Sequence, residues 1–147
     1  MWWLRVIVGL LSLQFLLGIW VSLFGSFPST NDVQSAVMYG GDPVLTGHYA
    51  LAVVLLVLAV VVVLATFRSG VTARLRWLTL GGLVSVIWAW ISGVDFILSG
   101  FANNSDSFSM AVALIVAMTF YGLAQAAVLP RAPASARGDE GASSPQS

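Results

Sequence analysis

The chain has 147 residues, of which 59% are hydrophobic and 8% are charged, and its formal net charge is zero. Soluble domains carry about 25% charged residues, so a chain of this composition is expected to have the lipid bilayer as its solvent. A zero net charge gives no general attraction to nucleic acid. The absence of cysteine excludes disulfides and thiolate metal sites.

The first apolar run predicts a membrane-spanning helix over residues 3–24. Trp2, Trp3 and Arg5 stand at its start, and aromatic rings beside a basic residue are typical of the membrane–water interface. About 20 helical residues suffice to cross ~30 Å of hydrocarbon. A polar segment without any basic residue then follows over 26–41 and is expected to be a loop.

Asp42 and Pro43 mark the start of a second helix, predicted over 43–67. Aspartate is a strong N-cap residue, and proline is well tolerated at the first helical position. The interior of this run is almost wholly Ala, Val and Leu. Valine is no obstacle to a helix in lipid, because the backbone there must satisfy its own hydrogen bonds.

Two further apolar runs predict helices over 73–98 and 108–129. A short basic turn precedes the third helix, and an arginine-free loop over 101–107 precedes the fourth, which is expected to stop at Pro130. The tail over 131–147 lacks any large apolar residue and is predicted to be disordered. Residues 1–130 therefore form one predicted transmembrane domain.

The basic residues lie only at alternate ends of the four runs. None falls within 26–47 or 99–107, and all six are arginine: Arg5, Arg68, Arg74, Arg76, Arg131 and Arg137. This distribution follows the positive-inside rule. It predicts an all-α, up-down-up-down four-helix bundle in a cytoplasmic membrane, with both termini and the tail in the cytoplasm. The use of arginine alone, with abundant Ala, Val, Leu and Gly, indicates a GC-rich prokaryotic source.

Polar side chains fall at two predicted depths, counted at 1.5 Å per residue from the outer helix ends. His48 at ~8 Å and Asp95 at ~6 Å belong to the outer layer and are expected to pair. The pair is open to three interpretations: a structural contact, a ligand site, or proton and ion handling. A deeper layer is predicted to form hydrogen bonds between helices, and it contains Gln14, Ser85 and Thr119.

The catalytic and metal motifs searched for are absent from the sequence. It contains no glycine-rich phosphate loop, no nucleophile elbow and no cluster of histidine and carboxylate with metal-ligand spacing. With one histidine in the chain, a hydrolytic or metal site is not expected. No catalytic residue and no metal are therefore predicted.

The stretch QFLLGIWV over 14–21, followed by Gly47-His48 at the start of a Val/Leu-rich helix, resembles one four-helix half of the haem A synthase family. Small four-helix membrane proteins share this layout. The resemblance implies that His48 is an axial haem ligand. The family's second histidine, near the start of the fourth helix, is not matched, because that helix opens with Ser107-Phe108-Ser109-Met110. A haem here would need Met110, or His48 of a second copy, as its other ligand.

Three functions are consistent with these patterns. The first expectation is a non-catalytic accessory or assembly subunit of a larger membrane complex, with a membrane-protein partner or a second copy. The second is a haem-binding, electron-transfer protein that uses His48. The third is a small transporter or channel subunit with a path past Asp95 and His48.

The predicted orientation can be tested by labelling, because the chain has no native cysteine. A single cysteine at Ser35 is expected to react with a membrane-impermeant thiol reagent added to intact cells. A cysteine at Ser69, in the arginine-rich turn, is expected to react only after the cells are opened. The reverse pattern would contradict the orientation.

Overall fold

The computed structural model describes residues 2–39 and 42–129, and the described chain is all-α. Its helices are α1 (Trp2–Phe24), α2 (Val33–Tyr39), α3 (Pro43–Arg68), α4 (Ala73–Leu98) and α5 (Asn104–Ala127). All but α2 are long and apolar enough to cross a membrane. The predicted tail over 131–147 and the predicted stop at Pro130 lie outside the described residues.

The predicted bounds hold closely for α1, α3 and α4, but the start of α5 was wrong. The helix begins at Asn104 and not at residue 108, because Asn103 caps it. The Asn103 side chain accepts a hydrogen bond from the Ser105 backbone N–H and donates one to the Asp106 carboxylate. Polar residues that were predicted to form a loop therefore form the first turn of α5. The segment over 26–41, also expected to be a loop, contains α2.

Asp42 caps α3 as predicted. Its carboxylate accepts the backbone N–H of Val44 at 2.8 Å and of Leu45 at 3.4 Å. It also accepts the N–H of Ser26 at 3.4 Å, which ties the end of α1 to the start of α3. These bonds, the one from Val44 above all, lower the pKa of Asp42 below its ordinary value. The half-buried Asp42 thus joins the two helices that carry the site described below.

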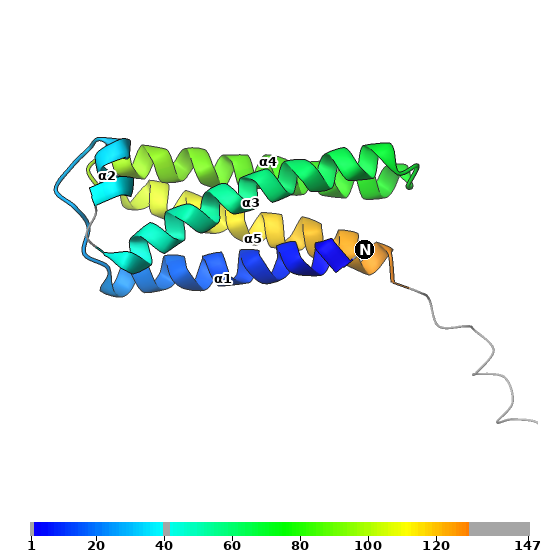
Figure 1. The fold of residues 1–147 in the computed structure, drawn as a ribbon, viewed down its shortest axis with the longest axis horizontal. Coiled ribbons are helices and arrows are strands. Elements are labelled where there is room, and N and C mark those ends of the chain that lie inside the picture. Colours follow the sequence, from blue (N-terminus) through cyan, green and yellow to red (C-terminus); the bar gives the residue numbers. More distant parts are fainter. Residues whose placement is uncertain (1, 40–41, 130–147) are drawn as a thin grey trace, which may run out of the picture.

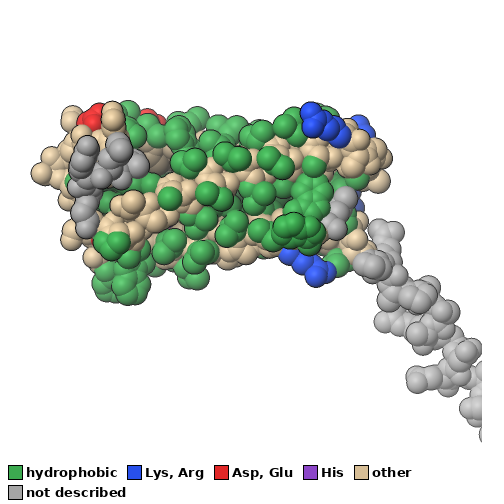
Figure 2. All heavy atoms as spheres, in the orientation of Figure 1, with side chains coloured by type: hydrophobic (Ala, Val, Ile, Leu, Met, Phe, Trp, Pro, Cys, Tyr) green, Lys and Arg blue, Asp and Glu red, His purple; other side chains and the backbone are tan. Residues whose placement is uncertain are grey.

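The four long helices run in alternating directions and pack in a ring (Figure 1). α1 packs against α3 and α5, and α4 packs against the same two helices. The short α2 contacts both α3 and α4, so it bridges them at one end of the bundle. Figure 2 shows the arginines gathered at the opposite end and the acidic groups near α2. We call these two ends the arginine end and the α2 end.

The packed core occupies the middle of the bundle and the half toward the arginine end. Gly82 of α4 lies directly against the Tyr121 ring of α5, and a Cβ added at Gly82 would lie 2.6 Å from that ring. Thr66 and Thr79 share a hydrogen bond of 3.1 Å that joins α3 to α4. The core comprises Leu4, Ile7, Leu11, Leu55, Ala59, Val62, Leu75, Val86, Ala89, Ala113, Leu114, Ala117, Tyr121 and Ala124.

Gln14, Ser85 and Thr119 were predicted to form hydrogen bonds between helices, and for Ser85 and Thr119 this prediction was wrong. Ser85 donates to the Gly81 carbonyl at 2.9 Å, and Thr119 donates to the Ile115 carbonyl at 3.0 Å. Both bonds lie within one helix, because a short hydroxyl side chain reaches the carbonyl four residues earlier. Gln14 is the one member that bonds across helices.

The close contact at Gly82 gives a stability prediction. Gly82→Ala should lower the free energy of unfolding by ~1–3 kcal/mol, because the buried Tyr121 ring must move to admit a methyl group. The measurement is a melt in detergent followed by circular dichroism. Gly122→Ala is the matched control, since nothing lies within 4 Å of a Cβ there. Equal melting temperatures for the two variants would contradict the packing at Gly82.

Candidate functional site

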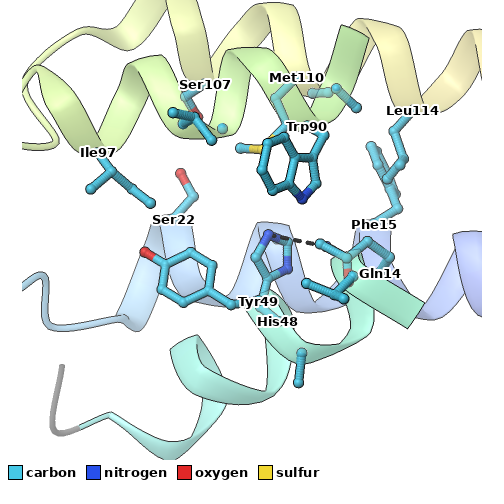
Figure 3. Close-up of a pocket in the computed structure, with 18 of the residues that line it drawn as sticks. Gln14, Phe15, Ser22, His48, Tyr49, Trp90, Ile97, Ser107, Met110 and Leu114 are labelled. Atoms are coloured by element: carbon cyan, nitrogen blue, oxygen red, sulfur yellow. Dashed lines mark hydrogen bonds between the residues drawn. The ribbon is translucent and has the colours of Figure 1, made fainter. Parts of the chain in front are cut away.

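The helices line a half-open cavity of about 440 Å³ at the α2 end of the bundle. All five helices contribute to its wall. Helices on opposite sides of the ring, α1 with α4 and α3 with α5, do not pack against each other. The cavity lies in the space between them. Figure 3 shows the side chains that point into it. The core described above closes the cavity toward the arginine end.

His48 and Gln14 form the polar centre of this cavity. His48 lies in the second turn of α3 and Gln14 in the middle of α1, and they are 8% and 5% exposed. Gln14 Nε2 lies 3.3 Å from His48 Nε2 (Figure 3). Gly18, one turn after Gln14, lets the imidazole pack against α1, because a Cβ there would lie 3.3 Å from His48 Cε1.

Two buried atoms of this pair have no hydrogen-bond partner among the described residues: His48 Nδ1 and Gln14 Oε1. An amide nitrogen can only donate, so His48 Nε2 is the acceptor in their shared bond. The imidazole proton of the neutral ring then sits on Nδ1. The pair therefore leaves one donor, Nδ1–H, and one acceptor, Oε1, buried without a partner. Each costs about 1–3 kcal/mol when buried without a partner.

The rest of the wall is largely apolar and partly aromatic. Phe15, Tyr49 and Trp90 surround the space next to the imidazole, and Met110 faces it from α5 (Figure 3). Among the residues that the structure describes, the wall contains no arginine, lysine, aspartate or glutamate. An ionised group inside the cavity would therefore have no counter-charge, which makes this a site for neutral chemistry.

Asp95 does not belong to the cavity. It is exposed on α4, while its neighbours Gly93 and Ile97 line the wall. Its carboxylate makes no hydrogen bond or ion pair with any residue that the structure describes. The expected pair with His48 is thus not formed. Asp95 lies on the outer face of α4, whereas neighbouring positions of the same helix line the cavity. Gln14 takes the place that was expected for Asp95.

Met110 lines the same cavity as His48, as a two-ligand haem site would require. Its sulfur packs at Gly93, where a Cβ would lie 3.3 Å from Sδ. Histidine with methionine is a sound axial pair for haem iron. However, the Nε2 lone pair, which would bind the iron, accepts the hydrogen bond from the Gln14 amide. The wall also has no basic residue to pair with haem propionates. In the arrangement that the structure shows, these residues do not fit a haem.

Comparisons with known proteins do not assign the chain to a family. No protein-family model, no curated protein and no solved structure matches the chain. The resemblance to haem A synthase halves stays a prediction. Four apolar helices of membrane-crossing length place the chain in the class of multi-pass membrane proteins. Within the described part of the chain, no group of three or more His, Cys, Asp or Glu side chains could hold a metal ion.

Sequence reasoning found His48 but missed its partner. The sequence-based estimate assumed that the outer ends of all helices lie at the same height, which places Gln14 ~7 Å deeper than His48. The structure brings them into contact because α3 crosses the bundle obliquely and the helix ends are not level (Figure 1). One available signal was that Gln14 is the sole amide side chain within the first three apolar runs.

A double-mutant cycle tests the contact between Gln14 and His48. We expect Gln14→Leu and His48→Phe to be non-additive by ~0.6 kcal/mol, and at most about 1.7, as for other hydrogen bonds between membrane helices. The measurement is the free energy of unfolding in mixed micelles with increasing dodecyl sulfate. Gln14→Leu combined with Thr119→Val is the control cycle, since Thr119 bonds within its own helix. Additivity in both cycles would rule out the contact.

Proposed function

We propose that this protein holds a small membrane-soluble molecule in the cavity at its α2 end. It acts as a non-catalytic accessory or assembly subunit of a larger complex in a prokaryotic cytoplasmic membrane. The observation that carries the proposal is a cavity of about 440 Å³ whose wall contains His48 and Gln14, each with one buried atom that lacks a partner, His48 Nδ1 and Gln14 Oε1. That volume is within the usual ~300–1,000 Å³ of small-molecule sites.

The polarity of the site supports ligand binding over a purely structural role. Most other buried polar side chains in the described residues bond to a neighbour, as Thr66 does with Thr79 and Ser92 with Ser109. The two free atoms at His48 and Gln14 instead belong to side chains of the cavity wall. A partner for either atom would recover the free energy that its burial costs.

The distribution of charge supports the orientation in the membrane. With the arginine end in the cytoplasm, the cavity lies in the outer leaflet, and both termini are cytoplasmic. Exposed apolar side chains continue from the cavity wall onto the lipid-facing surface, namely Ile19, Leu23 and Val53. A ligand dissolved in the bilayer can therefore enter sideways, without crossing the aqueous loops.

The accessory role follows from the chemistry that the cavity offers. Hydrogen bonding and apolar contact are available, but no side-chain nucleophile with an adjacent base lines the wall. Such a protein acts by holding its ligand for a partner, which is another membrane protein or a second copy of the chain. The transport hypothesis receives no support, because Asp95 and His48 do not share one path.

Filling the cavity tests ligand binding. Ala111 lines the wall on α5, whereas Ala126 is exposed on the same helix outside it. We expect wild type and Ala126→Phe, purified in mild detergent, to retain one small molecule in about stoichiometric amount by mass spectrometry of the organic extract. Ala111→Phe should retain far less. Equal retention by both variants, or none by wild type, would defeat the proposal.

The absorption spectrum decides between this function and the haem hypothesis. Protein purified from its host, with haem supply not limiting, should show aromatic absorption and no Soret band before or after dithionite. The reason is that Gln14 occupies the Nε2 lone pair of His48 and that the described wall has no arginine or lysine for haem propionates. A Soret band that His48→Ala abolishes would show instead that His48 is an axial ligand.

A further inference from the structure

A second, smaller cavity of about 140 Å³ adjoins the first at the α2 end, and the two share part of their walls. The shared residues include Ser22 of α1, Tyr49 of α3 and Ser107 of α5, and we call their side-chain oxygens the junction hydroxyls. None of the three has a hydrogen-bond partner among residues 2–39 and 42–129. Ser22 is exposed and the other two are half-buried, so the junction hydroxyls are accessible to a ligand.

The junction hydroxyls lie near the level where a bilayer changes from hydrocarbon to polar groups. At 1.5 Å per residue, Ser22 is ~3 Å from the end of α1, Ser107 ~5 Å from the start of α5 and Tyr49 ~9 Å from the start of α3. The Tyr49 side chain leans back toward the N-terminus of α3, and therefore toward the α2 end (Figure 3).

Helix length places this level relative to the lipid. Helices of 23 to 26 residues are ~35–39 Å long, whereas the hydrocarbon layer is ~30 Å thick. A few ångströms at each end of the bundle therefore lie among the polar groups of the lipids, where the ester groups of glycerolipids also lie. This match in depth holds for either orientation of the chain in the membrane.

Away from the α2 end, the larger cavity is walled by apolar side chains, among them Phe15, Ala89 and Leu114. Its wall is open to the bilayer, because Leu23 and Val53 belong to it and are 67% and 52% exposed. An empty cavity forfeits the dispersion contacts of its lining, and water finds few partners on an apolar wall. Acyl chains are the most concentrated apolar groups beside such an opening, so mass action favours them as occupants.

We infer that one acyl chain of a bilayer glycerolipid occupies the larger cavity, with its ester carbonyl at the junction hydroxyls. This inference rests on the proposed function and names the ligand class of the same site. The carbonyl accepts a hydrogen bond from at least one of the three hydroxyls. The head group stays at the membrane surface beside the exposed Ser22 and Leu23, where it needs no counter-charge from the wall.

Nuclear Overhauser effects between lipid and unmodified protein test where the chain lies. The protein, deuterated except at its methyl groups, is placed in nanodiscs of dimyristoylphosphatidylcholine with protonated chains. Ala89 and Leu114 line the cavity and are 7% and 8% exposed, so chain contacts there arise inside it. Both should show chain contacts, as should Val57, which is 58% exposed outside the wall. Ala117, fully buried and outside the wall, should show none.

A competition between ester and ether lipids tests the junction hydroxyls. Native mass spectrometry follows protein equilibrated with equal amounts of dimyristoylphosphatidylcholine and its di-O-tetradecyl analogue, which has the same head group but no carbonyl. Wild type should retain about fivefold more of the ester lipid, the typical effect of one hydrogen bond.

Variants then assign the preference. The triple variant Ser22→Ala, Tyr49→Phe, Ser107→Ala should retain both lipids equally. Its melting temperature should match that of wild type, because these hydroxyls bond to no described residue. Thr119→Val is the control, since its hydroxyl bonds within α5 outside the wall, and it should keep the preference.

The outcomes separate the inference from the proposed function. Silent Ala89 and Leu114 beside a responding Val57 would overturn the inference. The ligand-binding function would survive that result if the molecule in the organic extract is not a glycerolipid, and would fall with it if the extract holds none. Equal retention of ester and ether by wild type would also overturn the inference, as would a preference that persists in the triple variant.

Discussion

A polar group in hydrocarbon must find its partner inside the protein, and most features of this structure follow from that constraint. The backbone satisfies it by forming helices throughout the apolar runs. Ser85 and Thr119 satisfy it through carbonyls of their own helices, and Thr66 and Thr79 through each other. Four buried side-chain atoms of the described residues do not satisfy it, and two of them, on His48 and Gln14, belong to residues of the cavity wall; the other two are Arg76 Nε and Tyr121 Oη.

Small residues and oblique crossing decide where the bundle is packed and where it is hollow. α4 and α5 approach closely because Gly81 and Gly82 leave room for the rings of Phe120 and Tyr121. α1 and α3 approach because Gly18 leaves room for His48. Each pair is tight, and the space between the pairs at the α2 end is the cavity. The Asp42 cap and the bridging α2 hold that end together.

Local chemistry made much of the fold predictable. Asp42 and Pro43 marked the start of α3, and hydropathy marked all four long helices. The start of α5 was misjudged because Asn103 and Asp106 suit a loop and a capped first turn equally well when only neighbouring residues are considered. The short α2 was missed for a similar reason, since its seven residues are too few to show a helical period.

The sequence by itself determined that four long apolar helices form, where most of them begin and end, and that His48 lies within one of them. These properties depend on hydropathy, capping and charge within a few neighbouring residues. Only the tertiary structure decided that His48 meets Gln14 and that Asp95 faces away from the cavity. Such contacts depend on the tilt and rotation of one helix against another. Those angles are set by packing over the whole bundle, which no single segment of the chain specifies.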